Sequence, residues 1–343
     1  MSRITHLVRP NIAALTPYST ARDEYAGPIG IFLDANESPY ENGYNRYPDP
    51  HQALLKARIG AVKDIPAENL FLGNGSDEAI DLVFRVFCTP GKDNAVIMAP
   101  SYGMYGVAAD INDIAVRSVR LEADFSLDTE KLLAACDADT KVIFLCSPNN
   151  PSGNAFPKAQ LLEICDRFPG ILVVDEAYAD FSGCGSLATE AVSRENLIVL
   201  QTLSKARAMA GLRIGLAISS PEIIGLMSQV KYPYNLSRAA MEKALEFLEK
   251  DITEEVNTII AERERLQGIL PRYPFVRKVF PSDANFLLVR VDAPDALYAY
   301  LLDQGIIVRN RNRVPGCEGC LRLTVGLPQE NEALLRALDR YAL

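Results

Sequence analysis

Histidine is scarce in this chain: its 343 residues include two, His6 and His51. With so few, a catalytic triad built around histidine is a poor prediction. The seven cysteines lie mostly inside apolar runs, as Cys88 does. Cys317-Glu318-Gly319-Cys320 has the spacing of a metal or redox pair, but it has no second pair and no histidine near it in sequence. We therefore expect free thiols in a reducing compartment, a cytoplasmic protein and no metal site.

Long apolar runs and an excess of basic charge are also missing. No stretch reaches transmembrane length, and residues 1–20 lack the pattern of a signal peptide. Acidic side chains outnumber basic ones by 44 to 35, and the resulting charge of −9 argues against a general binder of nucleic acid or membrane surfaces. The length and the 48% of hydrophobic residues predict a soluble globular chain with more than one domain.

From about Asp34 onward, short apolar runs alternate with amphipathic helical stretches. This alternation predicts an α/β fold with a mostly parallel seven-stranded sheet. Several runs are almost continuously apolar, as expected for strands that are covered on both faces. The candidate strands are Leu70–Leu72, Ala95–Met98, Val116–Leu121, Val142–Cys146, Ile171–Val174, Leu197–Leu200 and Ile214–Ile218.

The same pattern divides the chain into three parts. Residues 1–28 are predicted to form an irregular arm that packs on the smaller domain, residues 29–236 the large domain with the sheet, and residues 237–343 a small α+β domain. In the small domain we expect long helices first, then strands at Asn285–Val291, Ile306–Arg309 and Cys320–Val325, with a helix near Asp295–Gln304.

Polar residues follow three of the predicted strands. Asn150, Asp175 and Lys205 each lie just beyond an apolar run, and Tyr178 follows Asp175 by three residues. Because ligands of such sheets bind at the carboxyl ends of the strands, these side chains can converge on one cleft. The set suits pyridoxal phosphate, which needs a lysine for a Schiff base, an acid for its ring nitrogen and donors for its ring oxygen.

Each of these residues also has a plain structural explanation. Asp175 could cap a helix or form an ion pair, and Asn150 could serve only the turn before Pro151. Tyr178 could be a half-buried tyrosine between domains. The joint occurrence of all four residue types at strand ends, in chain order, favours the cofactor interpretation.

A glycine-containing stretch, Gly73-Asn74-Gly75-Ser76-Asp77-Glu78, follows a strand and opens a helix. Backbone N–H groups at such a helix start attract a phosphate. An ordinary turn with a serine or aspartate cap would also explain this stretch on its own. Ser204 and Arg213 could hold the same phosphate, because arginine favours bidentate contacts with oxyanions.

The chain resembles the fold type I pyridoxal-phosphate aminotransferases, and within them the histidinol-phosphate aminotransferase subfamily. The resemblance extends from about Tyr18 to Gly326. It departs at Ser38, where asparagine or a similar residue is expected, at 235–237, which lacks the usual proline, and at Arg207, where an aromatic residue is expected and where a change could shift substrate choice. Its motifs occur in the expected order at Leu33–Pro39, Asn45–Pro50, Pro100–Tyr105, Cys146–Pro151 and Gly319–Gly326.

The resemblance implies a set of cofactor-binding residues. Three of them, Lys205, Asp175 and Tyr178, are implied to be catalytic. Tyr47 is implied to reach the cofactor phosphate of a neighbouring subunit, which predicts a homodimer with shared sites. The full set is Lys205 for the Schiff base, Asp175 for the ring nitrogen, Tyr178 and Asn150 for the ring oxygen, Tyr102 for stacking, and Gly75, Ser76, Asp77, Ser204, Arg213 and Tyr47 for the phosphate.

The substrate-binding residues implied by the resemblance are Tyr18, Asn36, Arg309 and Arg322. Arg322 is implied to hold the distal or the α anion of the substrate, and Arg309 and Tyr18 are further candidates for its phosphate. Arg322 lies between two leucines on a predicted strand, so alternation turns it away from them and toward a cleft. Arg309 follows an apolar run, and two arginines there could clamp a phosphate. Arg311 and Arg313 are expected to belong to a solvated basic loop.

The reaction implied by the resemblance is amino transfer from histidinol phosphate to 2-oxoglutarate, which in histidine biosynthesis runs from glutamate to imidazole acetol phosphate. Aromatic amino-acid aminotransferases and threonine-phosphate decarboxylases share most cofactor residues and remain alternatives. A catalytically silent protein on this scaffold is disfavoured because Lys205, Asp175 and Tyr178 are all present. A nucleotide-binding dehydrogenase is disfavoured because no G-x-G-x-x-G opens the sheet.

Overall fold

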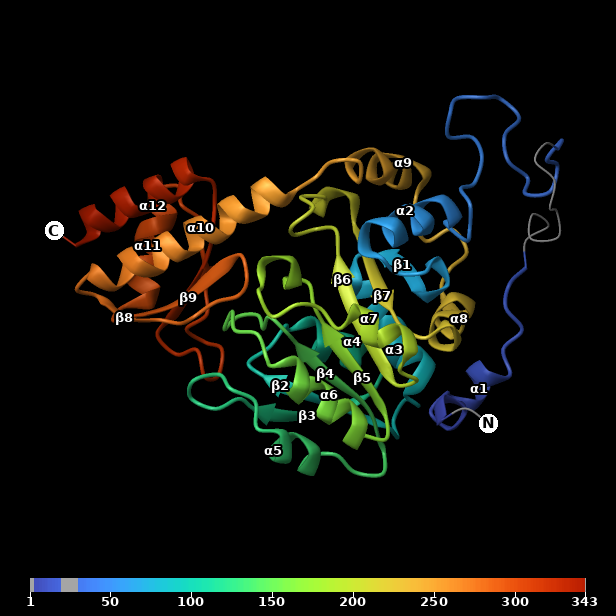
Figure 1. The fold of residues 1–343 in the computed structure, drawn as a ribbon, viewed down its shortest axis with the longest axis horizontal. Coiled ribbons are helices and arrows are strands. Elements are labelled where there is room, and N and C mark those ends of the chain that lie inside the picture. Colours follow the sequence, from blue (N-terminus) through green and yellow to red (C-terminus); the bar gives the residue numbers. More distant parts are fainter. Residues whose placement is uncertain (1–2, 20–29, 343) are drawn as a thin grey trace.

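The computed structural model describes residues 3–19 and 30–342. Its centre is a seven-stranded sheet with the strand order β1-β7-β6-β5-β4-β2-β3 (Figure 1). β7 runs antiparallel to β1 and β6, and the other pairs are parallel. The prediction of seven strands in a mostly parallel sheet is confirmed. The strands are β1 Leu70–Asn74, β2 Asn94–Ala99, β3 Ala115–Arg120, β4 Thr140–Cys146, β5 Ile171–Asp175, β6 Leu197–Thr202 and β7 Ile214–Ile218.

The middle strands of this sheet are covered on both faces. Every residue of β5, β6 and β7 is buried, and successive side chains of a strand point to opposite faces. β3, at one edge, is mostly exposed. The helices of this part of the chain are α2 Ala53–Lys63, α3 Ser76–Phe87, α4 Met104–Ile111, α5 Thr129–Ala134, α6 Lys158–Arg167, α7 Ala188–Ser193 and α8 Pro221–Val230.

A second, four-stranded sheet lies in the C-terminal part of the chain, with the order β10-β11-β9-β8 and antiparallel pairs throughout (Figure 1). Its apolar side chains form a core separate from that of the large sheet. Its strands are β8 Val276–Val279, β9 Phe286–Val291, β10 Arg309–Asn310 and β11 Cys320–Thr324, and the helices beside it are α10 Thr253–Ile269, α11 Pro294–Asp303 and α12 Pro328–Tyr341. α9 Arg238–Phe247 packs on α2 instead, and its buried Ala244 joins the core around the large sheet.

Two expectations about this part were incomplete or wrong. β8 and α12 were not predicted. The strand expected at Ile306–Arg309 forms only at its last residue and continues to Asn310. Ile306 instead donates its backbone N–H to the carbonyl of Leu301, which holds it against the C-terminal end of α11. The domain boundary near residue 236 stays a prediction.

The described part of the N-terminal arm packs on the large sheet's side of the molecule. Its helix α1 (Pro10–Ala13) lies at the end of Figure 1 opposite the small sheet. The buried side chains of Ile4 and Ile12 join the core around the large sheet. The backbone N–H of Arg9 donates to the Val86 carbonyl at 3.0 Å. For residues 3–19, the expected packing on the small domain is therefore wrong within this chain, because their apolar side chains fill space beside α3.

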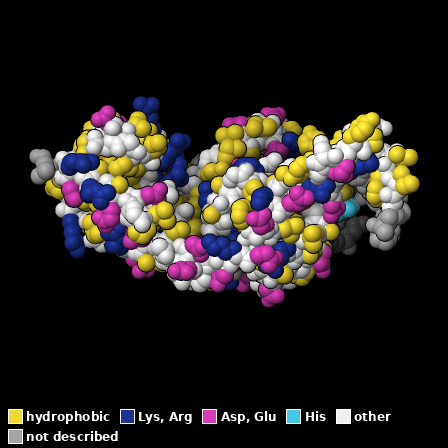
Figure 2. All heavy atoms as spheres, turned by 90° about the horizontal axis from the view of Figure 1, so that it is seen from above, with side chains coloured by type: hydrophobic (Ala, Val, Ile, Leu, Met, Phe, Trp, Pro, Cys, Tyr) yellow, Lys and Arg dark blue, Asp and Glu magenta, His cyan; other side chains and the backbone are white. Residues whose placement is uncertain are grey.

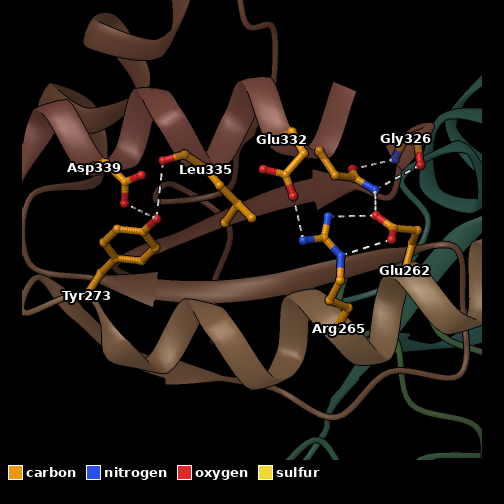
Figure 3. Close-up of polar contacts among 8 residues, drawn as sticks. Glu262, Arg265, Tyr273, Gly326, Glu332, Leu335 and Asp339 are labelled. Atoms are coloured by element: carbon orange, nitrogen blue, oxygen red, sulfur yellow. Dashed lines mark hydrogen bonds and ion pairs between the residues drawn. The ribbon is translucent and has the colours of Figure 1, made fainter. Parts of the chain in front are cut away.

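A polar network holds the turn after β11 against α10 (Figure 3). Buried Asn331 exchanges hydrogen bonds with the backbone of Gly326 at 2.9 Å and donates to Glu262 at 2.7 Å. Arg265 bridges Glu262 and Glu332. A buried amide with every partner satisfied favours one geometry over others. The network therefore fixes the end of the strand that carries Arg322.

The surface carries charges of both signs. Figure 2 shows acidic and basic side chains interspersed over the face in view, with hydrophobic side chains between them. Within residues 3–19 and 30–342, no helix has both the length and the apolar character needed to cross a bilayer.

Candidate active site

A cavity opens beside the carboxyl ends of β5 and β6. These parallel strands end side by side, so the residues that end or follow them meet. All of its lining residues except Ala177 and Thr202 were predicted to bind a cofactor. The cavity is lined by Gly75, Ser76, Asp77, Tyr102, Asp175, Ala177, Tyr178, Thr202, Ser204, Lys205 and Arg213.

Asp175 is a buried carboxylate at the end of β5, only 2% exposed. Its Oδ2 accepts a hydrogen bond from the hydroxyl of Tyr105 at 2.7 Å, and its Oδ1 accepts the backbone N–H of Ala177 at 3.0 Å. No described residue forms an ion pair with it, and burial raises its pKa above the ordinary value. A buried carboxylate is costly without a cation, so this position suits a protonated ring nitrogen.

Lys205 presents its amine to the same cavity. Among the described residues, its Nζ has no hydrogen bond or ion pair and lies 5.6 Å from the centroid of the Tyr178 ring. Desolvation lowers its pKa, and the charges of Arg322 and Arg213 lower it further, against the opposing effect of Asp175. A lysine with a lowered pKa is available as a neutral nucleophile.

A chain of polar contacts joins the two sheets at the cavity. Arg322 of β11 donates to Oδ1 of Asn150 at 2.6 Å, and Nδ2 of Asn150 donates to the hydroxyl of Tyr178 at 3.3 Å. Burial raises the pKa of Tyr178, so its hydroxyl keeps its proton. Asn150 is buried just behind the cavity wall rather than lining it. Both side chains can offer hydrogen-bond donors toward a ring oxygen.

The start of α3 forms the other end of the cavity. Gly75, at φ +74°, is its N-cap residue, and no side chain caps the first turn. The backbone N–H of Gly75 donates to the Arg213 carbonyl at 2.7 Å, while the Arg213 guanidinium lies 3.7 Å from Asp77. Uncapped N–H groups beside an arginine and Ser204 suit a phosphate.

Tyr102 lines the cavity, and the buried Tyr105 lies behind it. Tyr102 donates to Asp77 at 3.1 Å, and its ring meets that of Tyr105 edge-on at 5.6 Å. The contact between Tyr105 and Asp175 was not predicted from the sequence, although Tyr105 ends the motif that Pro100 begins. Tyr102 lies two residues before α4 and Tyr105 lies in its first turn, but which buried partner Tyr105 meets depends on tertiary packing.

Three predicted residues neither line the cavity nor lie beside its wall. Asn36 and Tyr47 line a separate hollow, where the Tyr47 ring stacks on Tyr234 with centroids 4.4 Å apart. Tyr18 is 74% exposed. Arg207, the departure from the family pattern, also lies apart from the cavity: it donates to the Lys250 carbonyl at 3.1 Å. Within a single chain, the predicted cofactor-binding residues therefore lie together at the cavity, except for Tyr47. Of the predicted substrate-binding residues, Tyr18 and Asn36 lie away from it.

The arginines of the small sheet gather at its edge. Arg309 of β10 lies directly opposite Arg322 of β11 in the antiparallel ladder. Arg313 is exposed, as predicted. Arg311 is not part of a solvated loop as predicted: it is partly buried, with its Nε shielded from solvent. Its backbone N–H donates to the Cys320 carbonyl, which continues the ladder and holds the side chain near Arg322.

The residues present fit pyridoxal phosphate. The cavity combines a buried carboxylate that lacks a cation, an unpaired amine, and an uncapped helix start beside Arg213. These are the three groups that the ring nitrogen, the aldehyde and the phosphate of this cofactor require.

Comparison with known proteins agrees with this geometry. Residues 33–338 match the family described as "Aminotransferase class I and II". The histidinol-phosphate aminotransferase of Parabacteroides distasonis is 53% identical over 345 residues, covering 100% of both chains. A solved histidinol-phosphate aminotransferase from Clostridium acetobutylicum superimposes with a TM-score of 0.79 at 26% identity, over 87% of this chain and 90% of that one. At 22% identity, the Sinorhizobium meliloti enzyme solved with pyridoxal-5′-phosphate shares the fold, with a TM-score of 0.78 over 87% of this chain and 83% of that one.

We expect Gly215→Ala to damage the phosphate end of the cavity. A Cβ at this position of β7 would lie 2.0 Å from the backbone nitrogen of Ser76, so the start of α3 would have to move. Cofactor affinity, measured by absorbance titration of the apoprotein, should fall at least about tenfold if one charge-assisted contact is lost. Gly225→Ala, in α8, is the matched control because its added Cβ meets nothing within 4 Å. Unchanged affinity in Gly215→Ala would contradict a role for this helix start.

The family match covers most of the chain, and a relative is more than half identical along its whole length. The chain therefore belongs to the class I and II aminotransferases, and among them to the histidinol-phosphate aminotransferase family.

Proposed function

We propose that this chain transfers an amino group from histidinol phosphate to 2-oxoglutarate with pyridoxal 5′-phosphate as cofactor, and that in biosynthesis it runs from glutamate to imidazole acetol phosphate. The observation that carries the proposal is the cavity where the amine of Lys205 and the buried carboxylate of Asp175 meet. The full-length similarity to named histidinol-phosphate aminotransferases supports the choice of substrate.

The cofactor supplies an electron sink for the bonds at the substrate's amino carbon. Lys205 would hold the cofactor through its Nζ and, once released, carry a proton between that carbon and the cofactor as a positioned base and acid. Its lowered pKa suits this task, because a neutral amine is needed to accept the proton. Asp175 would keep a proton on the ring nitrogen, held in position by Tyr105 and the backbone of Ala177.

The remaining cavity residues would orient the cofactor. Tyr178 and Asn150 would donate to the ring oxygen, and Tyr102 would pack against the ring. The start of α3, from Gly75 to Asp77, would bind the phosphate together with Ser204 and Arg213. Fixing both ends of the ring keeps the reacting carbon near Lys205, which is a large part of what an enzyme of this kind contributes.

The substrate's own phosphate would bind at Arg322 and Arg309, which lie opposite each other on β11 and β10. Arg322 reaches the cavity wall through Asn150, so an anion bound there lies next to the cofactor. Paired guanidinium groups favour an anionic substrate over a neutral aromatic side chain. This favours histidinol phosphate over aromatic amino acids, while a phosphate-bearing decarboxylase substrate is separated by its product, carbon dioxide.

The proposal is tested by an amino-transfer assay with histidinol phosphate, phenylalanine, tyrosine and aspartate side by side. We expect histidinol phosphate to be the best donor, without release of carbon dioxide, and the pure protein to be yellow. Borohydride should attach the cofactor to the peptide that contains Lys205, and Lys205→Ala should lose both the visible absorbance and turnover. Attachment to another lysine, or a colourless inactive wild type, would contradict the proposal.

We further propose that two copies share their active sites. Tyr47 and Asn36 line a hollow away from the cavity of their own chain. The segment that leads to them exposes apolar side chains, with Ile31 91% and Leu33 89% exposed, and such a surface suits burial against a second copy.

The free thiols of all seven cysteines suit a reducing compartment, so we place the protein in the cytoplasm.

Complementation between inactive subunits tests the shared site. In a heterodimer of Tyr47→Ala and Lys205→Ala subunits, one site has both native residues, so activity should recover to about half of the wild-type value per dimer. Each variant alone serves as the control. Purified heterodimers that are no more active than either parent, or a fully active monomer in sedimentation experiments, would contradict the shared site.

A further inference from the structure

Three arginines project from the same face of the small sheet's edge. Arg309 and Arg322 are direct partners across β10 and β11, and side chains of directly opposed residues share a face. Arg311 follows Arg309 by two residues, and its backbone continues the ladder by donating to Cys320 at 2.9 Å. Residues two apart on an extended strand point to the same side. Asn310, between them, donates instead to Asp295 of α11.

No carboxylate within residues 3–19 and 30–342 forms an ion pair with this cluster. Among the described residues, none of Arg309, Arg311 and Arg322 forms an ion pair, although the chain is acidic overall. Elsewhere in the same part of the chain, Arg265 and Arg277 each pair with acidic residues. Like charges held together without a counter-ion are unfavourable, so a binding role accounts for them better than stability does.

Arg311 and Arg322 are also incompletely satisfied. The Nε atoms of both lie buried without a hydrogen-bond partner. Burial lowers the pKa of Arg311 first, and the neighbouring charges of Arg322 and Arg309 lower it further. Arg311 thus lies beside two other guanidinium groups, with a buried Nε donor that no part of the described chain uses.

We infer that Arg311 is a specificity-determining residue that, with Arg309 and Arg322, selects substrates whose distal group is a phosphate dianion over substrates that end in a carboxylate. The inference rests on the proposed function and assigns the third arginine of the site. A phosphate monoester carries nearly two negative charges at neutral pH and three acceptor oxygens, whereas a carboxylate carries one charge and two oxygens. Three guanidinium groups match the dianion, and two suffice for the carboxylate.

The inference also accounts for how one site could serve both half-reactions. Of the two carboxylates of glutamate and 2-oxoglutarate, the distal one would need only the pair that faces each other, Arg309 and Arg322. Histidinol phosphate would engage Arg311 as well, through the extra oxygen of its phosphate. Removing Arg311 should therefore act on one half-reaction and largely spare the other, which a general weakening of the fold could not do.

The test measures each half-reaction of the holoenzyme separately by stopped-flow absorbance, in wild type, Arg311→Gln, Arg311→Lys and Arg313→Gln. Arg313→Gln is the matched control, because it removes the same charge from an exposed position on the same turn. For Arg311→Gln we expect kcat/KM with histidinol phosphate to fall about 10- to 100-fold, mainly through KM, as for the loss of one charge-assisted contact. With glutamate we expect a smaller change, less than about threefold, because its distal carboxylate would be held by Arg309 and Arg322 without Arg311.

Inorganic phosphate provides a second readout. It should inhibit the glutamate half-reaction competitively in wild type and in Arg313→Gln, and about tenfold more weakly in Arg311→Gln. Arg311→Lys should fall between wild type and Arg311→Gln, because it keeps the charge and loses the bidentate geometry. Thermal stability should not decrease in Arg311→Gln, since the substitution removes a repelling charge.

Two results would overturn the inference: equal losses with histidinol phosphate and glutamate in Arg311→Gln, or values equal to those of Arg313→Gln. These outcomes differ from failure of the proposed function, in which the wild type would not turn over histidinol phosphate. In that case, calorimetric titration of the holoenzyme with inorganic phosphate still decides the role of Arg311. Weaker binding in Arg311→Gln than in Arg313→Gln would support it, and equal binding would contradict it.

Discussion

The burial of one carboxylate, Asp175, is the constraint on which the site depends. It lies at the end of a strand covered on both faces, where an ionised group without a cation is unfavourable. Two hydrogen bonds, from Tyr105 and Ala177, fix its oxygens and favour its charged form, while burial opposes that form. A protonated ring nitrogen would supply the missing cation and so stabilise the charged carboxylate. The burial that makes ionised Asp175 unfavourable without the cofactor therefore strengthens its interaction with the cofactor once bound.

Strand order places the other groups around that carboxylate. β5 and β6 are parallel neighbours, so Asp175 and the segment after β6 that carries Lys205 leave the same edge of the sheet. β7 returns antiparallel and brings Arg213 back to the start of α3, where Gly215 permits a backbone contact that a larger residue would block. The second sheet adds the arginines from the opposite side, connected to the first through Arg322 and Asn150. The residues proposed to bind the cofactor therefore come from the large sheet, and those proposed to bind the substrate come mainly from the small one.

Much of this was predictable because it is encoded in short stretches of sequence. Apolar runs, several of them almost continuous, identified the seven strands. Polar residues at strand ends, the glycine-containing stretch and the family resemblance together identified nearly every residue of the cavity wall. What failed depends on distant contacts. Tyr105 meets Asp175 across 70 positions, and Arg311 is buried through the pairing of β10 with β11, so no local pattern marks either one. Tyr18, Asn36 and Tyr47 lie outside the cavity of the single chain, and their roles stay predictions.

The most direct test of the central claim is the rate of the first half-reaction in Asp175→Asn, measured by stopped-flow absorbance at full cofactor occupancy. Asparagine keeps the shape and can still accept from Tyr105, but it carries no charge to hold a proton on the ring nitrogen. We expect the cofactor to remain attached to Lys205 and the rate to fall about 10²- to 10⁴-fold, on the scale of other electrostatic and acid–base deletions. A near-wild-type rate would mean that Asp175 serves only the fold, and the account of the site would be wrong.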